Sequence, residues 1–257
     1  MILAVDIGNT NIVIGCFEND EILFIERLST NHQNTALEYI ISIKNILEIN
    51  STSPAEICGC IISSVVPNVT QTVREALERL TDSDVLTVGP GIKTGLKIML
   101  DNPAQLGSDQ VADAVAGVNL YSAPLIIIDM GTATTVSAID KDKNYIGGMI
   151  IPGIRVSLDS LTQRTSQLPK IGLEAPKKII GTNTVECMKS GIINYSASGI
   201  DGVTSRMEEE LGEKCTIIAT GGLAGTIIPH CKRDNIIIDD QLLLKGLMII
   251  YNKNRKQ

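Results

Sequence analysis

Two short segments of this 257-residue chain place an aspartate, a glycine and small polar residues directly after an apolar run. The first is DIGNTN (Asp6–Asn11) and the second is DMGTAT (Asp129–Thr134). A tight turn between two strands exposes successive backbone N–H groups, which together bind anions such as phosphate. Glycine lets the anion approach the backbone, and an aspartate at a strand end can hold Mg²⁺ through water. An ordinary hairpin turn is the competing interpretation, because Asn and Gly are favoured there as well.

The strand–turn–strand pattern occurs twice, as LAVDIGNTNIVIGCF (Leu3–Phe17) and IIIDMGTATTVSAID (Ile126–Asp140). Internal self-similarity indicates a duplicated architecture. Two such loops in facing halves would bind a triphosphate from both sides, so we expect a nucleotide between the halves. A third segment, ATGGLA (Ala219–Ala224), has a glycine pair at the start of an expected helix, which allows a flat adenosine to pack against the backbone. Alone, it would equally fit a plain strand-to-helix turn.

The spacing of apolar residues predicts the elements that position these loops. Continuous or alternating apolar runs predict strands, and apolar residues three and four apart predict helices. The pattern gives an α/β protein with two similar halves, residues 1–121 and 122–257. The expected strands are 1–7, 11–18, 21–29, 57–64, 84–88, 125–129, 134–139, 145–151, 216–220 and 236–239, and the expected helices are 35–49, 66–80, 107–121, 155–163, 184–211 and 241–251.

Composition excludes several classes of protein. The chain is 44% hydrophobic and carries a net charge of -7, which argues against disorder and against nucleic acid as the main partner. No apolar run approaches the roughly 18 residues of a membrane span, and the opening MILAVDIGNTN has no basic leader. The six cysteines lack zinc-site spacing and there are only two histidines. We therefore expect a cytoplasmic protein with free thiols and no membrane partner.

The two Asp-x-Gly loops followed by a Gly-Gly-x-Ala loop resemble the superfamily of acetate kinase, sugar kinases, actin and heat-shock ATPases. That resemblance implies the duplicated actin-like (ribonuclease H-like) fold, with mixed sheets flanked by helices. The sequence further resembles the type III pantothenate kinase family, in order from Met1 to about Tyr251. The family implies a transferase that phosphorylates pantothenate with ATP in the first step of coenzyme A biosynthesis. The matching words are DIGNTN, SSVVP (Ser63–Pro67), GPGIKTGL (Gly89–Leu96), DNPAQLGSD (Asp101–Asp109), DMGTATT, GGMIIPGI (Gly147–Ile154) and ATGGLA.

The resemblance also implies roles for individual residues. Asp109 matches the general base that accepts the proton of the acceptor hydroxyl, although an aspartate there could simply complement a helix dipole. Asp129 matches the ligand of a monovalent cation, K⁺ or NH₄⁺, and Asp6 is placed for Mg²⁺. The family forms homodimers with the acceptor pocket near the subunit interface. Expected ATP-binding residues are Asp6, Ile7, Gly8, Asn9, Thr10, Asn11 and Thr132, and expected substrate-binding residues are Leu100, Gly107, Ser108, Gln110 and Thr184.

Two acceptor-side positions depart from the family pattern. The family usually has Tyr where this chain has Leu100, and Arg where it has Gln110. A guanidinium pairs well with a carboxylate, whereas Gln offers a neutral amide. Three hypotheses follow: a pantothenate kinase with a modified pocket, a kinase of the same mechanism acting on another small alcohol, and a nucleotide-binding regulator without catalysis. The presence of Asp6, Asp109 and Asp129 argues against the third.

Overall fold

The computed structural model describes residues 1–255, and the chain divides into two compact units. Unit 1 comprises Met1–Leu96, Asp101–Ala116 and the C-terminal segment that begins at Leu242. Unit 2 comprises Lys97–Leu100 and Gly117–Gln241. Each unit has one mixed sheet flanked by helices, which confirms the predicted α/β class. The assignment of 1–121 and 122–257 as duplicated halves stays a prediction.

Unit 1 is built on a five-stranded sheet in the order β3-β2-β1-β4-β5. Strand β1 pairs antiparallel with β2 and parallel with β4, so the sheet is mixed. The turn between β2 and β3 has positive φ at Asn19 (51°) and Asp20 (66°), the backbone that a two-residue hairpin requires. The bounds are β1 (Ile2–Ile7), β2 (Asn11–Glu18), β3 (Glu21–Ser29), β4 (Gly59–Ser64) and β5 (Val85–Thr87).

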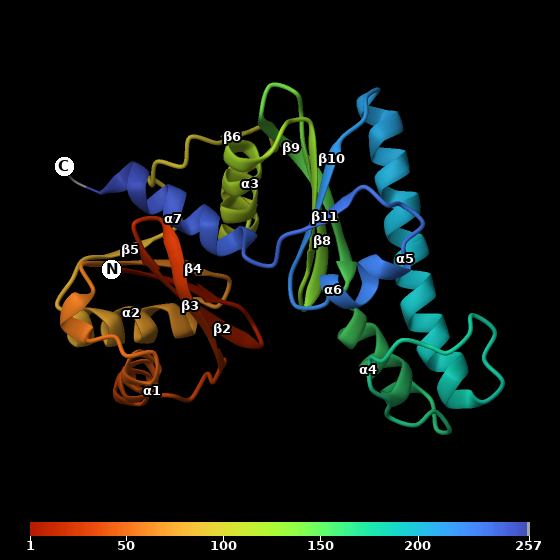
Figure 1. The fold of residues 1–257 in the computed structure, drawn as a ribbon, viewed down its shortest axis with the longest axis horizontal. Helices are drawn as coiled ribbons and strands as arrows, with labels where there is room; N and C mark the ends of the chain where they lie inside the picture. Colours follow the sequence, from red (N-terminus) through yellow and green to blue (C-terminus); the bar gives the residue numbers. More distant parts are fainter. Residues whose placement is uncertain (256–257) are drawn as a thin grey trace. The chain divides into compact units, whose positions relative to one another are not determined.

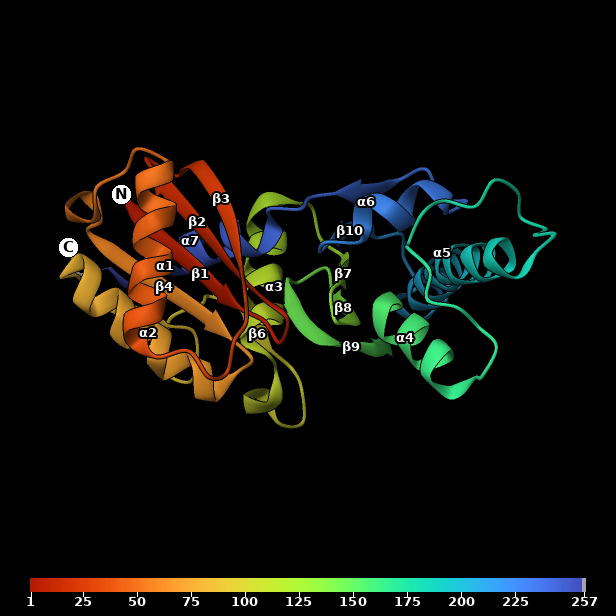
Figure 2. The same cartoon turned by 90° about the horizontal axis from the view of Figure 1, so that it is seen from below.

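Helices cover both faces of the unit 1 sheet. Helices α1 (Ala36–Ile49) and α2 (Pro67–Thr81) pack on the face that presents the alternate residues of β1, among them Leu3 and Val5. Figure 2 shows these two helices on the same side of the sheet. Helix α7 (Leu242–Asn254) lies on the other face, where small glycines in β2 and β4 leave room for its side chains. The central strands β1, β2 and β4 are therefore covered by helices on both faces of the sheet.

Unit 2 is built on a six-stranded sheet in the order β11-β10-β7-β8-β9-β6. Strands β7, β10 and β11 run parallel, and β8 pairs antiparallel with both β7 and β9. The two-residue strand β6, which pairs with β9, was not predicted. The bounds are β6 (Lys97–Ile98), β7 (Leu125–Met130), β8 (Ala133–Ile139), β9 (Asn144–Pro152), β10 (Thr216–Thr220) and β11 (Ile236–Ile238).

Helix α5 (Thr184–Leu211) provides most of the helical cover of the unit 2 sheet, with α4 (Ile154–Arg164) and the short α6 (Ala224–Ile227) on the same face. Figure 1 shows α5 running along the strands. Helix α3 (Ser108–Leu120) crosses the division between the units, and its last turn packs on the opposite face of the sheet. Single 3₁₀ turns are η1 (Pro54–Glu56), η2 (Pro103–Gln105) and η3 (Ile228–His230).

All the predicted strands and helices are present, with small shifts at their ends. Within residues 1–255, no helix is long and apolar enough to cross a membrane.

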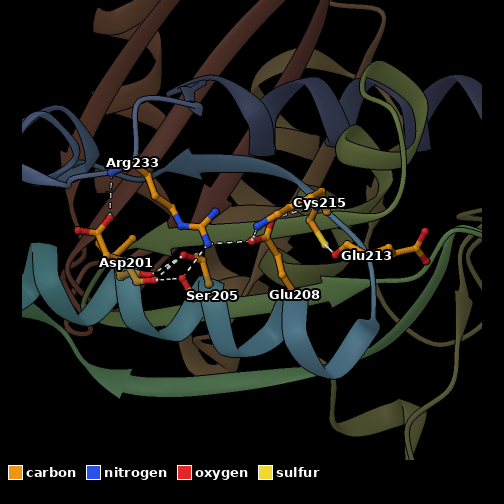
Figure 3. Close-up of polar contacts among 9 residues, drawn as sticks. Asp201, Ser205, Glu208, Glu213, Cys215 and Arg233 are labelled. Carbon is orange, nitrogen blue, oxygen red and sulfur yellow. Dashed lines mark hydrogen bonds and ion pairs between the residues drawn. The ribbon is translucent and has the colours of Figure 1, made fainter.

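A buried carboxylate ties two connecting segments of unit 2 to helix α5 (Figure 3). Glu208 accepts hydrogen bonds from the Arg233 guanidinium (2.8 Å), Lys214 Nζ (2.9 Å) and the backbone N–H of Cys215 (3.1 Å). Burial alone would raise the pKa of Glu208, but these donors outweigh it and lower the pKa to about 2. The cluster therefore fixes the chain where it enters β10 and β11.

Replacing Glu208 with glutamine is expected to lower the free energy of unfolding at pH 7 by about 2 kcal/mol, because it removes the anion between two cations. The folded-state pKa is depressed, so this stabilisation is present above the ordinary pKa of 4.5 and is lost as pH falls towards about 2. Urea unfolding at several pH values measures it, with exposed Glu209→Gln as the control. An equal effect of the two variants would contradict the prediction.

Candidate active site

The first predicted phosphate loop lies between β1 and β2 and is held by hydrogen bonds within unit 1. The Gly8 N–H donates to the Asn11 carbonyl at 3.0 Å, which closes the turn. Thr30, just after β3, donates its hydroxyl to the Gly8 carbonyl (2.6 Å) and its N–H to the Thr10 carbonyl (2.9 Å). The side of the loop made by residues 9–11 is exposed to solvent. Its backbone is thus fixed while its tip is open to a ligand.

Asp6 is the next-to-last residue of β1, and Ile7 is the only residue between it and the loop. It is half-buried, and it pairs in the sheet with Val13 of β2 and Ser63 of β4. Its carboxylate therefore belongs to the edge of the sheet at which the parallel strands β1 and β4 end.

The second loop joins β7 to β8 in unit 2 and is one residue shorter than the first. Met130 pairs with Thr134, leaving three residues in the loop, whereas Ile7 pairs with Ile12 around four. The Gly131 N–H donates to the Ala133 carbonyl at 3.1 Å, and Thr132 is exposed. Gly153, the N-cap of α4, packs so closely that a Cβ there would lie 2.7 Å from the Gly131 carbonyl oxygen.

The third predicted segment lies directly beside the second loop. Thr220, the last residue of β10, pairs with Asp129 of β7, and Gly221 follows with φ +87°. A Cβ on Gly221 would overlap the Asp129 carboxylate and lie 2.7 Å from the Met130 backbone nitrogen. Gly221 and Asp129, which are 92 positions apart in the sequence, thus meet through a contact that only glycine permits. Asp129 itself is half-buried at this point.

Asp109 lies in the first turn of α3, which is anchored to the end of β4. Ser108 Oγ donates to the Ser64 carbonyl (2.9 Å) and accepts from the Ser64 N–H (2.9 Å) and from the fully buried Ser63 hydroxyl (3.1 Å). Partial burial raises the pKa of Asp109 above its usual value, against the opposing hydrogen bond from the Gln110 N–H (2.8 Å). The result is a positioned carboxylate of increased basicity, which suits a general base.

The expected acceptor-side residues fall into two groups. Gly107, Ser108 and Gln110 surround Asp109 at the start of α3, and the Ser108 hydroxyl makes its hydrogen bonds to β4. Leu100 follows β6 in unit 2, and its Cδ2 would lie 4.0 Å from a Cβ added to Gly147. Thr184 is the exposed first residue of α5. It borders a shallow, mainly apolar hollow lined by Leu161, Leu168, Cys187, Met188, Gly191, Ile192 and Tyr195.

Sequence reasoning missed the residues that support these loops. Thr30 follows a strand and has no local signal that separates it from a turn residue. Ser63 and Ser64 lie in the SSVVP segment and Gly153 lies in GGMIIPGI, but their roles depend on contacts with distant segments.

Within residues 1–255, no group of three or more His, Cys, Asp or Glu side chains could enclose a metal ion. Single carboxylates at strand ends, Asp6 and Asp129, are nevertheless consistent with cations that keep water and ligand oxygens, as Mg²⁺ prefers.

Comparison with solved structures gives the fold. A Sinorhizobium meliloti protein described as a 2-dehydro-3-deoxygalactonokinase aligns over 100% of this chain and 98% of its own, with a TM-score of 0.63 and 12% identity. Component A of (R)-2-hydroxyglutaryl-CoA dehydratase from Acidaminococcus fermentans aligns over 99% of each chain, with a TM-score of 0.59 and 13% identity. These neighbours support the duplicated actin-like architecture and, at this identity, the fold alone.

Comparison with sequences gives the family. The family model described as type III pantothenate kinase matches residues 2–206. A type III pantothenate kinase of Exiguobacterium sp. is 42% identical over 100% of both chains. Another, from Bacillus cytotoxicus, is 43% identical over 99% of this chain and 97% of the relative. Because the family model matches most of the chain and relatives more than 40% identical align over nearly its whole length, the chain belongs to the type III pantothenate kinase family.

Proposed function

We propose that this protein transfers the γ-phosphoryl group of ATP to pantothenate, giving 4′-phosphopantothenate in the first step of coenzyme A biosynthesis. The observation that carries the proposal is the Asp109 carboxylate, held at the start of α3 by the Ser108 anchor and made more basic by partial burial. Relatives that match this chain from end to end bear the name of that activity.

Asp109 is the general base in the proposed mechanism. It accepts the proton of the acceptor hydroxyl as the oxygen bonds to the γ-phosphorus and the bond to the ADP oxygen breaks. Burial raises the pKa of Asp109 above the usual aspartate value, which makes the carboxylate a stronger base. Ser108 keeps the carboxylate in place, because its hydroxyl joins the first turn of α3 to Ser63 and Ser64.

The two Asp-x-Gly loops are the proposed phosphate-binding elements. In unit 1, residues 8–11 present an exposed turn whose backbone is fixed by Thr30. In unit 2, Thr132 is exposed on a turn held by Gly131 and Gly153. Backbone N–H groups and hydroxyls of this kind present positive partial charge to a phosphate, so an acidic protein can still bind this anion. Gly221, against the second loop, is proposed to lie under the adenosine.

The family implies two cations, and the residues present fit both. Asp6 is proposed to hold Mg²⁺ through water, because it is half-buried at a strand end beside the first loop. Asp129 is proposed to hold a monovalent cation, K⁺ or NH₄⁺, beside Gly221. Bound cations neutralise the charge that develops on the phosphoryl oxygens.

A cytoplasmic homodimer is also proposed, with the acceptor pocket near its interface. Several large apolar side chains of unit 2 are exposed, among them Ile150 (77%), Ile180 (78%) and Tyr195 (82%). Exposed apolar surface can be buried in a contact between protein subunits. Light scattering on the purified protein would report twice the 27.6 kDa chain mass.

A coupled ADP-release assay with pantothenate, Mg²⁺ and K⁺ tests the proposed reaction. The expected result is pantothenate-dependent ADP release that saturates with both substrates. No turnover at millimolar pantothenate would contradict it, and a screen of other small alcohols would then test the alternative acceptor suggested by Leu100 and Gln110.

The double change Leu100→Tyr with Gln110→Arg is expected to raise kcat/KM for pantothenate by about tenfold to a hundredfold, because a charged hydrogen bond contributes about 1.5–3 kcal/mol. Steady-state kinetics measure the effect. Gln105→Arg is the matched control, since it adds the same charge at an exposed glutamine of η2. If the double variant shows no gain, these two positions do not limit the use of pantothenate.

A further inference from the structure

Thr30 makes two hydrogen bonds to the first phosphate loop, although 22 residues separate it from Gly8 in the sequence. Its hydroxyl donates to the Gly8 carbonyl at 2.6 Å, and its N–H donates to the Thr10 carbonyl at 2.9 Å. Thr30 follows the last residue of β3, which pairs with the strand leaving the loop, so its position is set by the sheet. It lies on one side of the loop and contacts alternate carbonyls.

The orientation of these carbonyls decides where the loop N–H groups point. In a trans peptide, the C=O and the following N–H lie on opposite sides of the peptide bond. Because the Gly8 carbonyl points to Thr30, the Asn9 N–H points away from it. The same holds for the Thr10 carbonyl and the Asn11 N–H. Thr30 therefore turns two alternate N–H groups to the face of the loop opposite itself.

The direction of these peptides matters for an anion. A carbonyl oxygen turned towards a phosphate repels it, whereas an N–H attracts it. The Gly8 N–H belongs to the preceding peptide and donates to the Asn11 carbonyl, which closes the turn. The Gly8–Asn9 peptide is held by the Thr30 hydroxyl, which donates to its carbonyl. Losing that hydroxyl frees this peptide to rotate, because Gly8 tolerates many backbone conformations.

We propose that Thr30 is a positioning residue for nucleotide binding: its hydroxyl and N–H orient the Gly8–Asn11 loop so that backbone N–H groups face the phosphates of ATP. This rests on the proposed ATP-dependent function. Thr30 acts on the phosphate part of the nucleotide, so it affects ATP and leaves adenosine binding unchanged.

The test compares Thr30→Val, which keeps the shape and removes the hydroxyl, with Thr30→Ser, which restores a hydroxyl. Thr81→Val is the matched control, because Thr81 is a buried threonine of the same unit that donates to the Leu77 carbonyl at the end of α2. Calorimetry gives the Kd for ATP and for adenosine, steady-state kinetics give KM and kcat, and thermal unfolding gives Tm.

Thr30→Val is expected to weaken ATP binding about tenfold, in line with one lost hydrogen bond, with adenosine affinity and the KM for pantothenate unchanged and Thr30→Ser close to wild type. Unchanged ATP affinity in Thr30→Val, or equal losses for ATP, adenosine and pantothenate, would overturn the proposal. If wild type binds ATP but phosphorylates no pantothenate, the proposed function fails while the calorimetry still decides the role of Thr30. If wild type does not bind ATP, both fail.

Discussion

Asp109→Asn is expected to lower kcat by about 10²–10⁴-fold, the usual contribution of a general base, while the KM for ATP stays nearly unchanged. Asparagine has the shape of aspartate but cannot accept the proton of the acceptor hydroxyl. The Ser108 anchor and the first turn of α3 do not depend on the charge, so the site remains assembled. Steady-state kinetics and calorimetric ATP binding measure the two effects separately.

The pH dependence gives a second readout of the same residue. Burial raises the pKa of Asp109 above the ordinary aspartate value, and a general base works only when deprotonated. The acidic limb of kcat/KM should therefore lie at a higher pH than that of an exposed aspartate, with activity lost as pH falls through it. Asp142→Asn, at an exposed turn aspartate, serves as the control. If Asp109→Asn and Asp142→Asn lowered kcat equally, Asp109 would be excluded as the base.

Gly221→Ala is expected to destabilise unit 2 by about 2 to 5 kcal/mol and to abolish ATP binding. At φ +87° an alanine is strained by about 1–2 kcal/mol. Its Cβ would also lie 2.7 Å from the Met130 nitrogen and overlap the Asp129 carboxylate, and relieving such overpacking costs about 1–3 kcal/mol more. To relieve this overlap, Gly221 and the segment Asp129–Met130 must move apart, which displaces the start of the second phosphate loop. Urea unfolding and calorimetry measure both consequences.

Gly225→Ala is the matched control for this change. Gly225 lies four residues further on, in α6, where an added Cβ meets no atom within 4 Å. Alanine also favours the helix there, so stability should be equal or slightly higher. A Gly221→Ala protein that binds ATP with wild-type affinity would show that the approach of this glycine to Asp129 is not needed for the nucleotide.

Most of the fold could be predicted from the sequence, because the apolar and polar patterns of its segments match the elements that these segments form. The apolar run before Asp6 and its copy before Asp129 each became a strand of a sheet, and each polar segment became the turn after it. The predicted helix 184–211 has the same bounds as the long helix α5. These features depend on residues that are close together in the sequence, so they can be predicted from the sequence alone.

Other parts depend on contacts between distant segments and leave no local pattern. Strand β6 is two residues long and exists because β9 supplies its partner. Helix α7 was predicted as a helix, but its place in unit 1 follows from how its side chains fit over Gly15 and Gly59. Likewise, Ser108 anchors the candidate base only because β4 ends beside it.

The most direct measurement uses ATP labelled at the γ-phosphorus and pantothenate with the purified protein. Transfer of the label to 4′-phosphopantothenate, identified by its mass, with loss of that product in Asp109→Asn, is the predicted result. Label that stays in ATP or appears only as inorganic phosphate at millimolar pantothenate would contradict the proposed activity.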